Sequence, residues 1–270
     1  MKPSSVRALA LVAACALFPA AQVFSQSTLD EIAKYRQALQ EGNPAELWEA
    51  RGEALWKEKR GPKNASLEAC DLGKGAGVVK GAYAQMPRYF GDADRVMDLE
   101  TRLAHCMVSV QGMKPEDAIK RPYGAGTNRS DFEALAAWIT SESKGVTMNV
   151  ALDHAKEKEA YRLGEKMFYF RGGSHDFACA TCHGENGKRI RLQDLPNLTE
   201  KSGAQLGYTT WPAYRVSQGE LRTFQWRLYD CFRQQRFPEL KFTSEASVAL
   251  TMFLARNANG AAFNAPAIKR

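Results

Sequence analysis

The chain lacks long apolar runs beyond its first 25 residues. The run at its start, residues 8–21, follows two basic residues and leads to small residues that suit cleavage before Gln26. It is too short to cross a bilayer. We therefore expect a secretory signal peptide over residues 1–25 and no membrane span. An alternative is a lipoprotein cleavage site ending at Cys15, early in the same run.

The chain also has little excess charge of either sign. It holds 37 Lys and Arg against 30 Asp and Glu, a formal charge of +7. Removal of the signal peptide takes away two cations and no anion, which leaves +5. This basic excess suits small anions or an acidic partner and is too small to indicate a nucleic-acid-binding protein.

Histidine and cysteine are scarce, with four and six residues, yet three of them stand together in Cys179-Ala180-Thr181-Cys182-His183. Two thiols at this spacing followed by histidine are what covalent attachment of a c-type haem requires. The alternatives are a redox dithiol or half of a zinc site. Zinc would need a second ligand pair, but only the thiol Cys231 follows His183. The motif predicts one haem c held by Cys179 and Cys182, with His183 on the iron.

An internal repeat organises the mature chain. Two helical segments share Gly-Glu followed by an apolar pair, and each half has a cysteine 17 residues before a proline. Later landmarks are an Arg-Leu-x-x-Cys segment and an apolar helix begun near a serine. The paired landmarks, in order, are residues 46–56 and 161–169, Cys70 to Pro87 and Cys179 to Pro196, 102–106 and 227–231, and 134–139 and 248–254.

The repeat predicts an all-α fold of two cytochrome c-like helical domains in tandem, residues 26–148 and 149–270. A polar leader helix is expected over residues 28–43. Short β pairings within residues 76–92 and 186–210 are compatible with the sequence, but the periodicity there is too weak to assign them.

The first copy lacks part of the attachment motif. Where the second copy has both thiols and the histidine, the first has only Cys70, followed by Asp71-Leu72-Gly73-Lys74. It is therefore predicted to have lost its haem. Cys70 and Cys106 are the expected disulfide of an exported chain, worth about 3 to 4 kcal/mol by loop-closure entropy. The alternative is two free buried thiols.

The second axial ligand of the iron has few candidates. After His183 the chain holds no histidine, one methionine and one cysteine. Met252 lies in the apolar stripe of the last predicted helix, a core position. Cys231 precedes that helix and is the preferred distal ligand, and a thiolate there lowers the reduction potential of the iron.

Basic residues are dense around Cys231. Cations favour a thiolate and gather anions, and guanidinium groups suit oxyanions. The alternative is that they solvate the surface or bind haem propionates. The residues are Arg222, Arg227, Arg233, Arg236 and Lys241.

Together with the attachment motif, the segment Trp226–Pro238 resembles the A subunit of the SoxAX cytochrome complex of bacterial thiosulfate oxidation, over essentially the whole mature chain. Family members carry two haems or one, and this chain looks like the single-haem kind. The resemblance implies a periplasmic L-cysteine S-thiosulfotransferase that joins thiosulfate to a cysteine of the SoxYZ carrier. It implies a SoxX cytochrome subunit as heterodimer partner. Cys231 would be the distal ligand and catalytic sulfur, as thiol or persulfide, and Arg227 would bind the substrate anion.

Two further functions stay open at this point. A plain electron-transfer cytochrome would use Cys231 only to tune the potential of the iron. A thiosulfate dehydrogenase would couple two thiosulfates into tetrathionate without a carrier protein.

Overall fold

The computed structural model describes residues 30–31, 34–35, 37–39, 41–190 and 193–269, and the chain forms two compact units, Met1–Gly42 and Asn43–Arg270. In the first unit, the described residues from Asp30 to Glu41 are helical, within the predicted leader helix. The predicted signal peptide, residues 1–25, lies outside the described residues.

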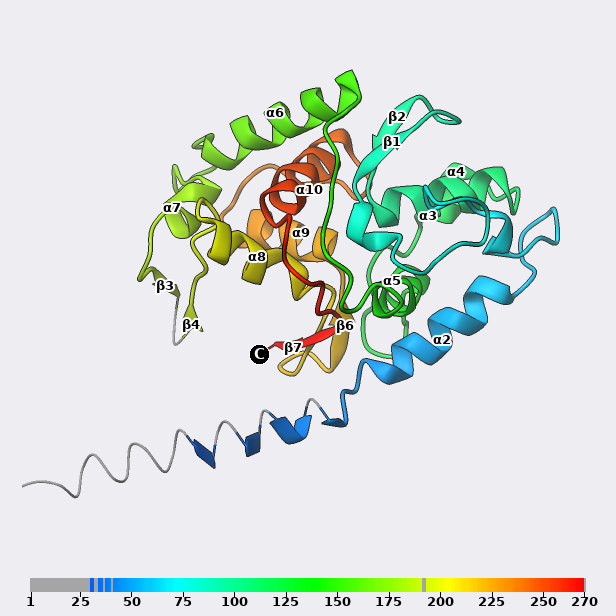
Figure 1. Cartoon of the computed structure of the whole chain (residues 1–270), viewed down its shortest axis with the longest axis horizontal. Coiled ribbons are helices and arrows are strands. Elements are labelled where there is room, and N and C mark those ends of the chain that lie inside the picture. Colours follow the sequence, from blue (N-terminus) through cyan, green and yellow to red (C-terminus); the bar gives the residue numbers. More distant parts are fainter. Residues whose placement is uncertain (1–29, 32–33, 36, 40, 191–192, 270) are drawn as a thin grey trace, which may run out of the picture. The chain divides into compact units, whose positions relative to one another are not determined.

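The second unit is mainly helical (Figure 1). Two short 3₁₀ turns, Leu67–Ala69 and Tyr83–Gln85, lie in the first half. The α-helices are α2 (Glu46–Lys57), α3 (Leu99–Ser109), α4 (Pro115–Ala118), α5 (Asp131–Ser141), α6 (Ala155–Tyr169), α7 (Cys179–His183), α8 (Lys201–Thr209), α9 (Phe224–Gln234) and α10 (Glu245–Asn257).

The expectation of an all-α fold needs correction, because short strands accompany the helices. The described strands form three sheets, two of which are antiparallel hairpins. The third sheet has the order β6-β5-β7, with β5 antiparallel to β6 and parallel to β7. Strands of two or three residues are too short to produce a visible period in the sequence. Their bounds are β1 (Arg88–Phe90), β2 (Arg95–Met97), β3 (Arg189–Ile190), β4 (Gln193–Asp194), β5 (Ala213–Arg215), β6 (Glu220–Arg222) and β7 (Ala267–Lys269).

Each half of this unit contains one close helix crossing at a glycine. A Cβ atom on Gly52 of α2 would overlap the carbonyl oxygen of Ala134 in α5. A Cβ atom on Gly164 of α6 would likewise overlap the carbonyl oxygen of Ala249 in α10. Both glycines belong to the Gly-Glu pairs of the repeat, so these small residues let the helix backbones approach.

The first half and the second half share buried contacts. Tyr83 stacks on Tyr208 with ring centroids 6.2 Å apart and packs against Phe263 at 4.9 Å. The side-chain amide of Gln225, at the start of α9, donates to Asp98 at 2.7 Å. The helix that carries Cys231 is thus fixed by the half without the haem motif.

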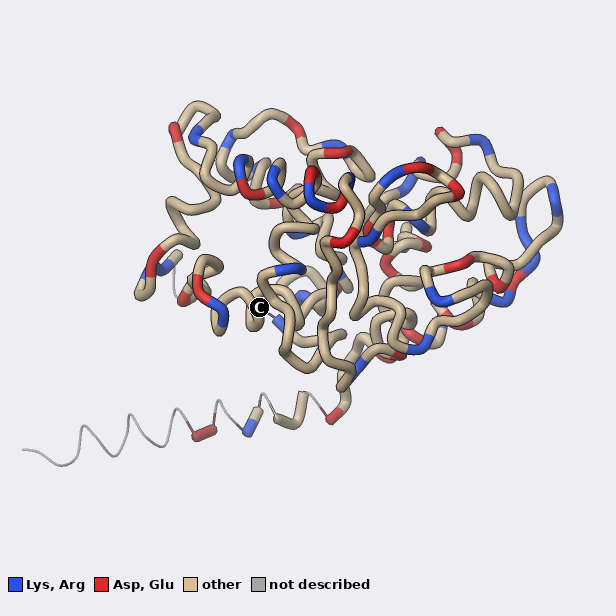
Figure 2. The backbone as a smooth tube through the Cα atoms, turned by 45° about the horizontal axis from the view of Figure 1, so that its top comes forward, with Lys and Arg blue, Asp and Glu red and all other residues tan. Residues whose placement is uncertain are grey.

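The charged residues of both signs are interspersed along the described chain (Figure 2). Within the described ranges, none of the helices combines the length and apolar character needed to cross a membrane.

Candidate functional site

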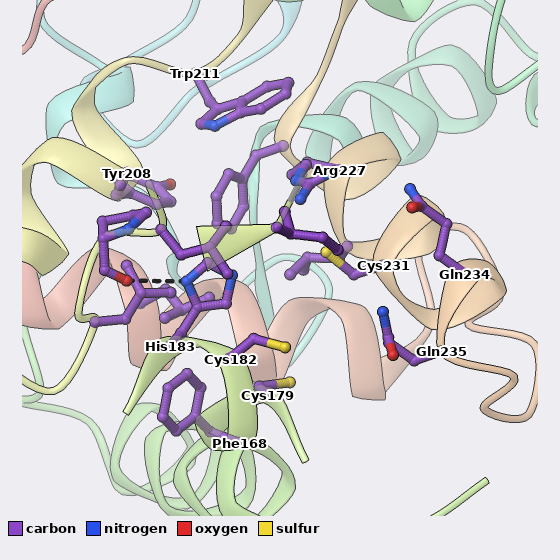
Figure 3. Close-up of a pocket in the computed structure, with 18 of the residues that line it drawn as sticks. Phe168, Cys179, Cys182, His183, Tyr208, Trp211, Arg227, Cys231, Gln234 and Gln235 are labelled. Atoms are coloured by element: carbon purple, nitrogen blue, oxygen red, sulfur yellow. Dashed lines mark hydrogen bonds between the residues drawn. The ribbon is translucent and has the colours of Figure 1, made fainter. Parts of the chain in front are cut away.

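A cavity of about 310 Å³ lies in the second half and brings together the residues of the attachment motif and Cys231. Most of its lining is apolar and aromatic, including Phe168, Tyr208 and Trp211. Figure 3 shows the sulfurs of all three cysteines and the imidazole of His183 turned toward the same space. Among the described residues, the ionisable and thiol side chains that line it are Cys179, Cys182, His183, Asp194, Tyr208, Arg215, Arg227, Cys231 and Lys269.

The short helix α7 presents Cys179, Cys182 and His183 to the cavity. Residues three and four apart share one face of a helix, so the motif spacing places both thiols and the imidazole together. Nδ1 of His183 lies 2.9 Å from the carbonyl oxygen of Pro196. Since Nδ1 donates there, Nε2 carries no hydrogen and is available as a metal ligand.

Electrostatics favour the neutral imidazole. Burial lowers the pKa of His183, and the hydrogen bond to Pro196 opposes that shift only in part. A neutral ring is the form that binds a metal. Burial also raises the pKa of the Cys179 thiol to about 12. That thiol stays uncharged in this pocket, which suits an apolar thioether position.

Helix α9 carries Cys231 and Arg227 one turn apart. Its first turn is capped by Thr223, whose hydroxyl accepts from the N–H of Trp226 at 3.3 Å. Both side chains line the cavity. Met252, the other candidate ligand, is fully buried in the core and does not line the cavity.

The donor set fits a c-type haem. Two thiols and an imidazole come from one short helix, and a third thiol reaches the same apolar cavity from α9. These four donors line the cavity, but among the described residues no three His, Cys, Asp or Glu side chains lie close enough together to hold a bare metal ion.

The expected lowering of the Cys231 pKa by surrounding cations is not what the structure shows. Burial raises the pKa of this thiol, and the guanidinium of Arg227 is the main opposing influence. The effect of burial is larger because the free energy needed to remove the thiolate charge from water exceeds the attraction of that charge to one partly screened guanidinium group. A bound metal would shift this balance, since it deprotonates a coordinating thiol.

Of the five basic residues that the sequence places near Cys231, Arg227 is the one that lines the cavity. Arg222 pairs with buried Glu133 at 2.8 Å, and Arg233 pairs with Asp230 at 2.8 Å while 61% of its side chain is exposed. Arg236 and Lys241 are exposed on the surface.

Two lining cations, Arg215 and Lys269, were missed because they lie on β5 and β7, far from Cys231 in sequence. Only the pairing of these strands brings them to the cavity. The sequence carried no local signal for them.

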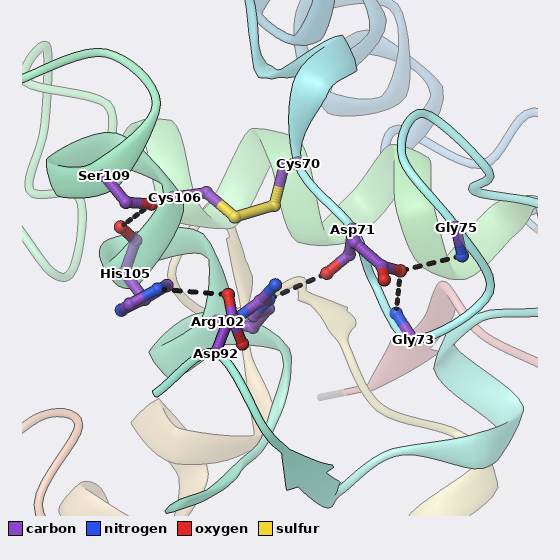
Figure 4. Close-up of a disulfide and its surroundings, with 9 residues drawn as sticks. All are labelled: Cys70, Asp71, Gly73, Gly75, Asp92, Arg102, His105, Cys106 and Ser109. Carbon is purple, nitrogen blue, oxygen red and sulfur yellow. Dashed lines mark hydrogen bonds and ion pairs between the residues drawn. A yellow bond between two sulfur atoms is a disulfide. The ribbon is translucent and has the colours of Figure 1, made fainter. Parts of the chain in front are cut away.

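The residues of the first half that align with the attachment motif and with Cys231 make covalent and ionic contacts (Figure 4). A disulfide joins Cys70 and Cys106, the pair that the sequence predicts, with 5.7 Å between their Cα atoms. Arg102 donates to the carbonyl oxygen of Asp71 at 2.7 Å and to both oxygens of Asp92 at 2.8 Å. Its guanidinium also lies over the ring of Phe90.

Comparison with known proteins identifies the family of the chain. The family model of the SoxA/TsdA cytochrome c domain matches residues 51–148. The L-cysteine S-thiosulfotransferase subunit SoxA of Hydrogenophilus thermoluteolus is 46% identical, over 98% of this chain and 99% of that protein. A protein of the same name from Hydrogenobacter thermophilus is 32% identical, over 97% of this chain and 96% of its own.

A solved structure shows the same fold. The crystal structure of SoxXA from P. pantotrophus matches with a TM-score of 0.71 at 23% identity, covering 88% of this chain and 84% of that chain. A relative 46% identical over nearly the full length of both proteins establishes the family. The chain belongs to the family of SoxA subunits of L-cysteine S-thiosulfotransferase.

Proposed function

We propose that this chain is the haem-bearing subunit of an L-cysteine S-thiosulfotransferase that joins thiosulfate to a cysteine of a SoxYZ-type carrier. The main observation in support of this proposal is that the attachment motif, Cys231 and Arg227 line the same apolar cavity. The relatives that share the name over nearly the whole chain support this assignment.

The chemistry of the reaction sets what the site must do. An S–S bond forms between the carrier thiol and the outer sulfur of thiosulfate, and the two reactants together lose one proton and two electrons. A haem c held in the cavity supplies a one-electron acceptor, from which partner cytochromes take the electrons. The protein must hold the two sulfur species close and offset their negative charge.

Different residues of the cavity are proposed to hold the haem, to supply the catalytic sulfur and to bind the substrate anion. Cys179 and Cys182 would hold the haem through thioether bonds, and His183 and Cys231 would bind its iron. Cys231, as a thiol or a persulfide, would be the catalytic sulfur of the site. Arg227 lies one turn earlier on α9 and would bind the sulfonate oxygens of thiosulfate.

The chain follows a tandem plan of two cytochrome c-like modules, residues 26–148 and 149–270, with one haem. The matching cytochrome c family model falls on residues 51–148, a segment without a Cys-x-x-Cys-His motif. The repeated glycine crossings of α2 with α5 and α6 with α10 also support two copies. Disulfide Cys70–Cys106 takes the place of the haem contacts in the first module.

The partners and the compartment are part of the same proposal. A monohaem SoxX-type cytochrome would form the heterodimer, and the similarity of this chain to the SoxXA structure from P. pantotrophus supports such a partner. A disulfide suits an oxidising compartment, which supports export to the periplasm.

The test uses the haem-loaded complex with its carrier. The variant Cys231→Met should keep the covalent haem, lose the ferric spectrum of a thiolate ligand and lose thiosulfate conjugation to the carrier. Mass spectrometry of the carrier detects the conjugate. Full turnover by Cys231→Met would contradict the role of Cys231. Tetrathionate formed without carrier would instead show a thiosulfate dehydrogenase, and no turnover with any acceptor would show an electron carrier.

A further inference from the structure

Two cations from neighbouring strands lie side by side at the cavity. Arg215 of β5 and Lys269 of β7 are register partners in the parallel pair. Paired residues of adjacent strands project to the same face of a sheet, and both side chains line the cavity. The strand order is therefore what places this pair of cations beside the proposed haem.

The charges around this cavity do not balance. Among the residues that the structure describes, three cations line it, Arg215, Arg227 and Lys269, whereas Asp194 is the one carboxylate in its lining. Asp194 is already bound by Arg189 at 2.8 Å. A cavity with this lining suits an anion.

Arg227 has a partner, but the other two cations do not find one among the described residues. Arg227 contacts Asp230 at 3.3 Å. Arg215 and Lys269 form no ion pair and no side-chain hydrogen bond within the described ranges. Glu220 of β6 is the register partner of Arg215 on its other side, yet it makes no ion pair with that guanidinium.

Burial makes the missing partners costly. Nε of Arg215 is a buried donor without an acceptor. Burial, together with the charges of Arg215 and Arg227, lowers the pKa of Lys269 to about 8. The ring of Trp211, 5.5 Å from Nζ of Lys269, offers a cation–π contact but no counter-charge. Buried charged groups are ordinarily paired.

We propose that Arg215 and Lys269 form a two-cation site that binds an anionic oxygen group inside this cavity. The site deepens the proposed function and rests on it for the identity of its ligand. Two sources carry such oxygens, the carboxylates of a bound haem and the sulfonate of thiosulfate. A planar guanidinium beside an ammonium group suits either one.

The experiment compares haem-loaded Arg215→Gln and Lys269→Gln proteins with wild type. Arg171→Gln and Lys188→Gln are matched controls, because these exposed residues pair with Asp176 and Glu185 outside the cavity. Charge-conserving Arg215→Lys and Lys269→Arg proteins separate loss of charge from loss of packing. Spectroelectrochemical titration gives the reduction potential, and steady-state kinetics give KM and kcat for thiosulfate.

The two sources predict different results. If the haem carboxylates occupy the site, each Gln variant lowers the reduction potential, because an uncompensated carboxylate favours the ferric state, and KM stays unchanged. If thiosulfate occupies it, KM rises about tenfold or more while the potential stays unchanged. In both cases the charge-conserving variants stay closer to wild type than the Gln variants, and the exposed controls match wild type.

The proposal is overturned if both Gln variants retain the wild-type potential and a KM within twofold of wild type. If the Gln variants fail to load haem, the charge-conserving variants are used to decide the question. The proposal is overturned if the charge-conserving variants also fail to load haem. The potential is measured without turnover, so a protein inactive with thiosulfate still tests the haem arm. If the wild-type enzyme turns over normally while neither the reduction potential nor KM changes in the variants, only the two-cation site is rejected and not the proposed function.

Discussion

Nδ1 of His183 lies 2.9 Å from the carbonyl oxygen of Pro196. This contact fixes the tautomer and the orientation of the ring that the attachment motif places beside the two thiols. Pro196 is one end of the 17-residue spacing that recurs between Cys70 and Pro87. The second half thus has a defined partner for its histidine, whereas the first half has no histidine at the corresponding position.

Substitution of Arg227 should separate anion binding from haem binding. Arg227→Ala removes the cation that lines the cavity beside Cys231, so KM for thiosulfate should rise about 10- to 100-fold with haem content unchanged. Arg233→Ala is the matched control, because Arg233 also contacts Asp230 on α9 but points outside the cavity. Equal effects of both substitutions on KM would contradict the role of Arg227.

The disulfide should stabilise the fold without touching the haem site. Replacing Cys70 and Cys106 together by alanine should lower the free energy of unfolding by about 2 to 4 kcal/mol, because a loop spanning 36 positions is no longer closed. Urea unfolding of the haem-loaded protein measures the change. The ferric absorption spectrum should match that of wild type. A shifted spectrum would show that the disulfide also positions the haem pocket.

The two helix crossings should be equally intolerant of a side chain. Gly52→Ala and Gly164→Ala each place a Cβ atom on a facing carbonyl oxygen, so each should destabilise the protein by about 1 to 3 kcal/mol or more. Lys158→Ala on the exposed face of α6 serves as control. Thermal and urea unfolding report the effect, and an unchanged stability for either glycine variant would argue against that close approach.

Glu133 should make stability depend on pH. Burial raises its pKa to about 7, and the charge of Arg222 opposes the shift. A carboxyl whose folded pKa exceeds its unfolded value of 4.5 binds its proton more tightly in the folded state. The stability it contributes is therefore present below about pH 4.5 and is lost as pH rises through about 7.

Urea titrations between these two pH values test this linkage. Glu133→Gln should reduce the loss of stability across the window by up to about 3 kcal/mol. Glu53→Gln, at an exposed position of α2, should leave the pH dependence unchanged. A wild-type slope in the Glu133→Gln protein would assign the linkage to other buried carboxyls such as Glu100, whose pKa burial raises to about 8.

The site was only partly predictable. The spacing of Cys179, Cys182 and His183 places them on one helix face through local geometry alone. The disulfide followed from the repeat, because the register paired Cys70 with Cys179 and Cys106 with Cys231. In contrast, the density of arginines around Cys231 suggested several cations at the cavity, but of these residues Arg227 is the one that lines it. Proximity in the sequence does not reveal which side of a helix faces inward.

The fold shows the same division. The helix starts near Ser130 and Ser244 were predicted, and α5 and α10 begin directly after these residues, with a side-chain cap at Ser244 and none at Ser130. The sheet of β5, β6 and β7 was not predicted, because its strands are three residues long and β7 comes from the end of the chain. Arg215 and Lys269 became neighbours only through that pairing.

The sequence by itself determined the haem attachment motif, the repeated Gly-Glu pairs and the pairing of Cys70 with Cys106, because each depends on short spacing or on comparison of two copies. Tertiary structure decided which cations face the cavity and how far burial outweighs their effect on the Cys231 thiol. Both depend on distances between segments remote in sequence, and those distances are set by packing rather than by local pattern.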